Sequence, residues 1–244
     1  MRIEENRRPG AESRPARATS AEPAMRVGVA LPRFGEVAEP RAIARIAERA
    51  EAFGYDTAWL LEPGSEGTFD PLTVAAYLAG RTRSIGFGVW WKTGDCGAGT
   101  ILRRIRSANA VSEGRMTIAV AHPAGYFDET PAAQASARLV EVTPESARVP
   151  VPGTAAIARC QVTFQEIEGA RPRFAGSFAQ IAGDIAHYRS LGVAEVIVDF
   201  AYSATVAKLG DYLMHLERLG EAVGLAPAAT VPVWPPDDAF DWLT

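Results

Sequence analysis

The sequence has little cysteine, little histidine and little net charge, and each shortage excludes a class of protein. Its two cysteines, Cys96 and Cys160, are too few for a disulfide framework, so we expect a reducing, cytoplasmic location. Its three histidines show no metal-ligand spacing, so we expect no metal site. A net charge of −4 and a pI of about 5.5 argue against a surface that binds nucleic acid or an acidic membrane.

The chain also lacks long apolar runs, and its two ends lack regular apolar patterning. No run approaches the ~18 residues of a membrane span, so we expect no transmembrane helix. Residues 1–24 contain five arginines, four glutamates and three prolines, which predicts a disordered tail. Met25 follows this tail and is a second possible start of translation. Residues 225–244 are proline-rich but contain two tryptophans and a phenylalanine, which predicts a docking tail after a folded domain of residues 25–224.

Apolar periodicity inside the predicted domain indicates strands that alternate with helices. We expect six or seven strands, at residues 26–32, 55–62, 84–91, 114–120, 137–142, 160–164 and 194–200. We expect helices at residues 40–53, 74–80, 100–111, 178–191 and 206–219. Successive strand–helix–strand units are typical of a parallel α/β sheet. A complete (β/α)8 barrel needs ~250 residues, whereas 220 follow the first tail, so the barrel is incomplete or the sheet is open.

Several motifs in the first half resemble bacterial luciferase-like monooxygenases. They are Asp56–Glu62, Ala75–Leu78, the strand that enters Gly88, and Gly114–Arg115. Two further motifs, Val29–Gly35 and Asp70–Thr73, are similar to the actinobacterial branch that uses the deazaflavin F420. The likeness covers about residues 26–121 and resumes over residues 174–223.

The resemblance implies a fold, a cofactor and a dimer. The fold is a TIM-barrel-derived luciferase-like α/β fold, here with fewer than eight βα units. The cofactor is FMN or F420, and the substrate is a small, apolar organic compound. The dimer is a homodimer, or a heterodimer with a homologue, that forms through the second and third helices, residues 71–80 and 100–111. No partner among nucleic acids or membranes is expected.

The sequence departs from the family pattern in two places. Luciferase-type members have a histidine after the Leu-Leu-Glu run, but Pro63 stands there in this chain. The fifth and sixth βα units should follow Ala121, yet only an irregular, proline-rich segment does. The lost units resemble those of the truncated, non-fluorescent relatives of luciferase, which also lack part of the barrel. With the histidine also missing, the chain is expected to use FMN, F420 or no cofactor.

The candidate catalytic residues are Glu62 and His122. Glu62 follows a predicted strand at the end where barrel enzymes have their active sites, and burial would raise its pKa and suit it to acid–base catalysis. Its alternative role is structural. His122 stands where the family often has a basic residue that reaches the cofactor phosphate, so it either makes that contact or donates a proton. His187 and His215 are expected to be surface or boundary residues of helices.

The candidate cofactor-binding residues are Phe34, Gly88, Trp90 and Trp91, which would line the barrel mouth. The family has a non-proline cis peptide at the end of the third strand, which implies one between Trp90 and Trp91 beneath the ring. The alternative places one tryptophan in the core and the other under a helix.

Two classes of function remain. One is a flavin- or F420-dependent oxidoreductase. The other is a catalytically degenerate relative that acts as a ligand-binding protein, a partner subunit or a cofactor-free enzyme. A mouth filled by the chain's own side chains would exclude the first class.

Overall fold

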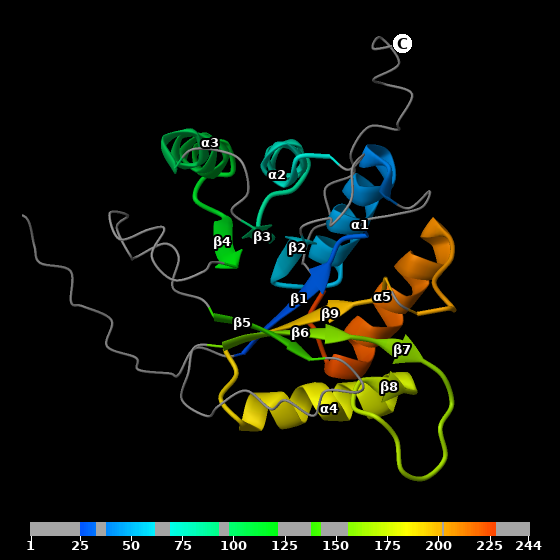
Figure 1. The fold of residues 1–244 in the computed structure, drawn as a ribbon. Helices are drawn as coiled ribbons and strands as arrows, with labels where there is room; N and C mark the ends of the chain where they lie inside the picture. The colour runs from blue at the N-terminus through cyan, green and yellow to red at the C-terminus, as the bar shows by residue number, and fades with distance from the viewer. Residues whose placement is uncertain are drawn as a thin grey trace, which may run out of the picture.

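The fold consists of a large parallel sheet with helices on its outer face (Figure 1). It was obtained as a computed structural model, which describes residues 25–32, 38–61, 69–92, 98–121, 138–142, 156–201 and 203–227. The strands are β1 (Arg26–Ala30), β2 (Thr57–Leu61), β3 (Gly86–Lys92), β4 (Met116–Ala121), β5 (Arg138–Val142), β6 (Ala156–Gln161), β7 (Thr163–Phe164), β8 (Ala175–Gly176) and β9 (Glu195–Asp199). The helices are α1 (Pro40–Ala52), α2 (Pro71–Ala79), α3 (Ala98–Val111), α4 (Phe178–Ser190) and α5 (Leu209–Val223).

The large sheet has the strand order of a barrel that is open at one place. Its order is β4-β3-β2-β1-β9-β6-β5, and every neighbouring pair is parallel. The first strand therefore lies between the second and the last, as in a TIM barrel. Within the described ranges no ladder joins β4 to β5, and the sheet contains seven strands. The prediction of a barrel-derived α/β fold is confirmed, whereas the number of its units is established only for the described ranges.

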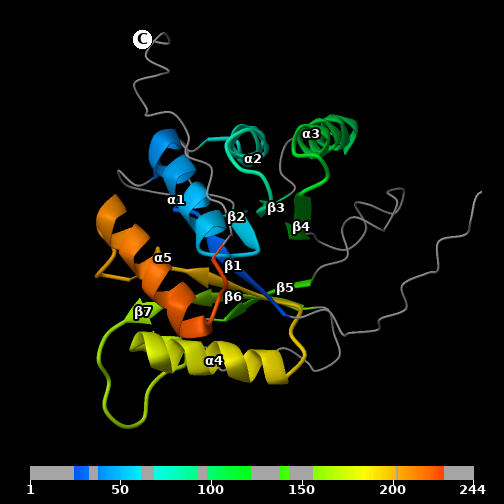
Figure 2. The ribbon, with the colours of Figure 1, turned by 180° about the vertical axis from the view of Figure 1, so that it is seen from behind.

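Both faces of the central strands are buried. Every residue of β2 and of β9 is buried. Alternate side chains such as Val29 and Val198 pack outward against the helices, while Trp59 and Ile197 pack into the barrel interior. Helices α1, α2 and α3 cover one part of the sheet, and α4 and α5 cover another (Figures 1 and 2). This two-sided burial is typical of parallel sheets.

Local sequence signals explain where the best-predicted helices begin and end. Helix α1 has Pro40 at its first turn, and Gly54 follows it with φ of 83°, a conformation that glycine adopts most easily. Helix α4 begins with a capping box between Ser177 and Gln180. Both helices lie where the apolar periodicity predicts them.

The strand predicted at residues 160–164 is only partly correct. The structure has β6 up to Gln161, then a break at Val162, then the short β7. The apolar pattern concealed the start of β6 because Arg159 interrupts it, and that arginine is buried in the barrel interior. The predicted tails, residues 1–24 and all but three residues of 225–244, lie outside the described ranges.

The side chain of Glu51 joins α1 to the start of β3. Its Oε1 accepts hydrogen bonds from the backbone N–H groups of Arg83 (2.9 Å), Ser84 (2.5 Å) and Ile85 (2.9 Å), and from the Ser84 hydroxyl (2.9 Å). Burial of the carboxyl raises its pKa, but the backbone N–H groups stabilise the charged form, and the net effect is a lowered pKa of Glu51.

Arg115, from the Gly114–Arg115 motif, makes a second set of hydrogen bonds at the same end of the sheet. Its Nη2 donates to the Ala79 carbonyl (2.8 Å), and its Nη1 donates to Thr82 Oγ1 (3.0 Å) and the Ile85 carbonyl (3.2 Å). It therefore ties the end of α2 to the entry of β3, which gives this motif a structural role.

We predict that Glu51→Gln lowers the free energy of unfolding by about 2–3 kcal/mol at neutral pH, because buried N–H groups lose their charged acceptor. The folded-state pKa lies below the unfolded value of 4.5, so the contribution of Glu51 is complete above that value. It should disappear as the pH falls through the lower folded-state pKa. Urea unfolding at several pH values measures the difference. Glu217→Gln, at an exposed position of α5, should leave the free energy of unfolding unchanged. An equal loss of stability in both variants would contradict the structural role assigned to Glu51.

Candidate functional site

The interior of the open barrel is built in layers, as alternate residues of each strand point inward. An inner cluster consists of Ala30, Trp59, Leu61, Ile157 and Ile197, with Trp90 packed against it. Because the strands are parallel, their carboxyl ends meet at one edge of the sheet. This is the edge where barrel enzymes have their active sites.

The opposite, amino end of the interior is closed by a network around Glu195. Its Oε1 accepts hydrogen bonds from Trp59 Nε1 (2.6 Å) and from the Thr57 hydroxyl, and Arg26 Nη2 lies 2.5 Å from its Oε2. Glu195 is fully buried, whereas Arg26 reaches solvent. Residues at the amino end of barrel strands serve stability rather than catalysis, so we assign this network to the fold.

At the carboxyl end, an ion pair joins β6 to β9. Arg159 donates from Nε (2.9 Å) and from Nη2 (2.6 Å) to Asp199 Oδ2, and Asp199 Oδ1 accepts from the Ala201 N–H (3.0 Å). The guanidinium carbon of Arg159 lies 6.0 Å from the centre of the Trp90 ring. A flat apolar side chain and a buried positive charge therefore lie together at the mouth.

The predicted site residues divide into two groups. Trp90 is half-buried on the inner cluster at the carboxyl end, as a mouth residue should be. Phe34, Glu62 and His122 lie outside the described ranges, although Glu62 directly follows β2 and His122 directly follows β4 in sequence. Their roles stay predictions.

The backbone around Trp91 differs from the prediction. Both tryptophans belong to β3, which pairs in register with β4 through Trp90↔Ala119 and Trp91↔Val120. The described backbone contains no cis peptide bond, so the prediction of one at this place is wrong. A regular ladder with β4 needs no such bond, because alternate residues already direct the Trp90 side chain inward. The Trp91 side chain is outside the described part of the structure, and its predicted cofactor contact stays a prediction.

Packing against Trp59 explains why residue 88 is a glycine. A Cβ at this position would lie less than 3.0 Å from the Trp59 ring, so the absence of a side chain lets the indole cross β3. Trp59 is completely buried. Any cofactor must therefore lie above this layer, toward Leu61 and Trp90; the predicted contact of Gly88 with a cofactor stays a prediction.

Neither Arg159 nor Asp199 was predicted as a site residue, and the prediction that His215 is a surface or boundary residue is wrong. His215 is buried: Nδ1 lies 2.7 Å from the Asp211 carbonyl, Nε2 lies 3.2 Å from Thr205 Oγ1, and its ring packs on Phe164. The position of Asp199 at the end of an apolar strand was a signal for a mouth residue. No local signal pairs it with Arg159, which is 40 residues away.

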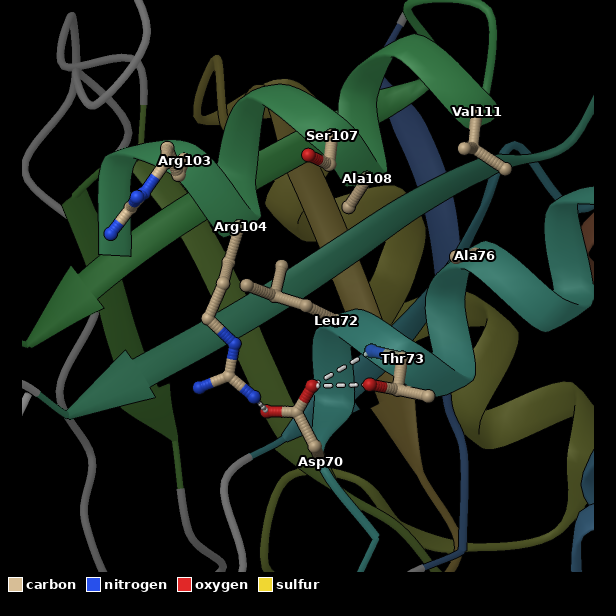
Figure 3. Close-up of a pocket in the computed structure, with 9 residues that line it drawn as sticks. All are labelled: Asp70, Leu72, Thr73, Ala76, Arg103, Arg104, Ser107, Ala108 and Val111. Atoms are coloured by element: carbon tan, nitrogen blue, oxygen red, sulfur yellow. Dashed lines mark hydrogen bonds and ion pairs between the residues drawn. The ribbon is translucent and has the colours of Figure 1, made fainter. Parts of the chain in front are cut away.

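An outer pocket of about 340 Å³ lies between α2 and α3 (Figure 3). Apolar side chains such as Leu72, Ala108 and Val111 line it, and an ion pair between Arg104 Nη2 and Asp70 Oδ2 (3.0 Å) borders it. No residue of the inner cluster lines it.

The sequence model described as "Luciferase-like monooxygenase" matches residues 18–149, more than half of the chain. The chain belongs to the luciferase-like monooxygenase family. No curated protein matches the sequence.

Solved structures show the same luciferase-like fold at low sequence identity. The F420-dependent tetrahydromethanopterin reductase from Methanopyrus kandleri is 12% identical, with a TM-score of 0.61, over 82% of this chain and 98% of that one. Apo-MsnO8 is 13% identical, with a TM-score of 0.54, over 84% of this chain and 100% of that one. The EDTA monooxygenase from Chelativorans sp. BNC1 is 10% identical, with a TM-score of 0.53, over 84% and 95%.

Among the described residues, no group of three or more His, Cys, Asp or Glu side chains could hold a metal ion. None of the helices in the described ranges is both long and apolar enough to span a bilayer.

We predict that Gly88→Ala lowers the free energy of unfolding by about 1–3 kcal/mol, because the new methyl group overlaps the buried Trp59 ring. Gly183→Ala is the control: this helical glycine of α4 has open space around its Cα, so alanine should stabilise the protein by up to about 1 kcal/mol. Chemical denaturation measures both. An unchanged free energy of unfolding in Gly88→Ala would show that the Trp59 ring does not require glycine at this position.

Proposed function

We propose that this chain is an oxidoreductase of the luciferase-like family that uses FMN or F420 to act on a small, apolar organic compound. The observation that carries the proposal is that Trp90 lies next to the buried Arg159–Asp199 ion pair at the carboxyl end of the sheet. Family membership supports the same conclusion. The names of the matched reductase and monooxygenases describe those proteins, and at these identities they support the fold alone.

The described residues of the mouth fit a flat heteroaromatic group. Leu61 and Trp90 offer apolar surface, and Arg159 offers a positive charge beside it. Trp59 is completely buried in the layer below and closes the floor of the barrel interior. When bound, the flavin or deazaflavin would supply the redox step.

The chain itself would bind and orient the ring, exclude water and move a proton. Trp90 would hold the ring by contact with its flat face. Glu62 would exchange a proton with the substrate, and His122 would contact the cofactor phosphate or donate a proton. Phe34 and Trp91 would complete the wall. We also propose a cytoplasmic location, because Cys160 is a free, buried thiol and the sequence has only one other cysteine.

A catalytically degenerate relative is the alternative. It is favoured by Pro63 at the place of the family histidine, and by the unpaired seam between β4 and β5 in the described structure. Such a chain would bind a flat ligand, or an active homologue, without redox chemistry.

We further propose that two copies associate through α2 and α3, as a homodimer or as a heterodimer with a homologue. Of the four large hydrophobic side chains that are exposed in the described structure, Phe69, Tyr77 and Val111 lie at these helices, and only Met214 lies elsewhere. Grouped apolar exposure is typical of protein interfaces. The pocket between the two helices could receive side chains of the second copy.

The cofactor prediction is tested by titrating the full chain with FMN and with F420, each oxidised and reduced, while tryptophan fluorescence is recorded. We expect saturable binding of one cofactor in the micromolar range, and we expect Trp90→Leu to weaken it about three- to tenfold through lost ring contact. Phe178→Leu, on outer helix α4, should bind normally. If no form of either cofactor binds, the oxidoreductase proposal fails and the degenerate alternative replaces it.

The dimer prediction is tested by light scattering. We expect twice the chain mass of 26.1 kDa for the wild type, and the mass of one chain for the double variant Tyr77→Arg/Val111→Arg, because two buried charges would oppose association. Met214→Arg introduces the same charge on α5 and should leave the dimer intact. A wild type that is monomeric at micromolar concentration would contradict this interface.

A further inference from the structure

Helix α1 presents a row of arginines on its outer face. Arg41, Arg45 and Arg49 follow one another at four-residue spacing, and all three are exposed. Residues at this spacing lie on one side of a helix, here over about 12 Å of its length. Within the described ranges, neither Arg41 nor Arg49 forms an ion pair. We call these three residues the arginine row.

The acidic residues of α1 do not neutralise the arginine row. Glu48 pairs with Arg81 (2.6 Å), which precedes β3. Glu51 accepts hydrogen bonds from the backbone N–H groups of residues 83–85. The row is therefore a concentration of positive charge on a chain whose net charge is −4. Such a surface attracts a partner of negative charge.

The chain leaves α5 close to one end of the arginine row. Gly224 ends α5 in a left-handed conformation, with φ of 77°. Two residues later the backbone reaches the end of α1, where a Cβ on Gly54 would overlap the Ala226 carbonyl. Gly54 follows Arg49 by less than two helical turns. The residues beyond Pro227 therefore begin beside the row.

These following residues, 228–244, are chemically complementary to the row. They contain no lysine, arginine or histidine, and they contain acidic and large aromatic side chains, namely Asp237, Asp238, Asp241, Trp234, Phe240 and Trp242. An arginine guanidinium pairs with carboxylates and also stacks on aromatic rings. Arg49 already does the latter, since its guanidinium carbon lies 4.7 Å from the centre of the Phe53 ring.

The segment is also long enough to reach every arginine of the row. Asp237 lies 11 residues beyond Ala226, and an extended chain spans about 3.3 Å per residue, so this carboxylate can reach up to about 36 Å. The whole of α1, with 13 residues, is only about 20 Å long.

We propose that residues 228–244 dock along α1, with their aspartates on Arg41 and Arg49 and their aromatic rings stacked over the arginine row. Helices α1 and α5 already lie side by side on the outside of the sheet (Figure 2). A segment that leaves α5 and binds α1 would join the first helix of the domain to the last. The inference is independent of the proposed function, because it uses no residue of the mouth.

The test is cleavage of the full chain by chymotrypsin, which cuts after tryptophan and phenylalanine and so can remove the segment; mass spectrometry measures the rate. We expect slow removal from the wild type at low salt. Arg41→Glu/Arg49→Glu should accelerate removal about tenfold, because cleavage follows the population of the undocked form. Added salt should accelerate it in the wild type and not in this variant, because salt screens exposed ion pairs.

A charge swap separates direct pairing from a general loss of stability. The triple variant Asp237→Lys/Asp238→Lys/Asp241→Lys should also accelerate removal of the segment. Combined with Arg41→Glu/Arg49→Glu, it should restore slow removal, because opposite charges face each other again. Two changes that merely destabilised the fold would make cleavage faster still. A combined variant that is cleaved as fast as either parent would overturn the inference.

Arg106→Glu/Arg189→Glu is the matched control. Both arginines are exposed, on α3 and α4, and their reversal changes the net charge by the same amount. The segment of this variant should be removed at the wild-type rate. Equal rates in the wild type, the control and Arg41→Glu/Arg49→Glu would overturn the inference. Protection that weakens on dilution would also overturn it, because the segment of a second copy would then occupy the row.

Discussion

The parallel pairing of β1 with both β2 and β9 is the constraint on which the remaining structure depends. It places the first strand between the second and the last, through Gly28↔Thr57 on one side and Gly28↔Ile197 on the other. A sheet wound in this way has an inside and an outside, so every central strand must be apolar on both faces. It also brings the carboxyl ends of all its strands to one edge, and the candidate site exists only because of that edge.

The sequence could predict elements whose signals are local. Helix α4 is the best case, because Ser177 and Gln180 supply a capping box in front of a regular apolar stripe. Strand β6 is the opposite case, because Arg159 interrupts its apolar pattern and only the assembled barrel shows that this arginine is inside. The prediction for His215 was wrong for a related reason: a helical histidine is normally exposed, and the burial of this one depends on packing against Phe164 of β7.

The site was predictable to the same limited degree. The carboxyl ends of β2, β3 and β4 can be read from the sequence, so residues such as Trp90 could be assigned to the mouth. The Arg159–Asp199 pair could not, because it depends on the register of β6 against β9, where Cys160 lies opposite Val198. The role of Gly88 likewise depends on Trp59, which crosses from the neighbouring strand. Register is a long-range property, and short motifs do not contain it.

The seam between β4 and β5 has a consequence for how the chain folds. It falls in the middle of the sequence, so residues up to 121 and residues from 138 form two half-barrels that meet through the β1–β9 ladder. That ladder pairs Arg26 with Glu195, 169 residues away in sequence. Each half has mostly local contacts, whereas their docking must bring together segments that are far apart in the sequence. We therefore expect assembly of the two halves, rather than formation of either, to be the slow step of folding.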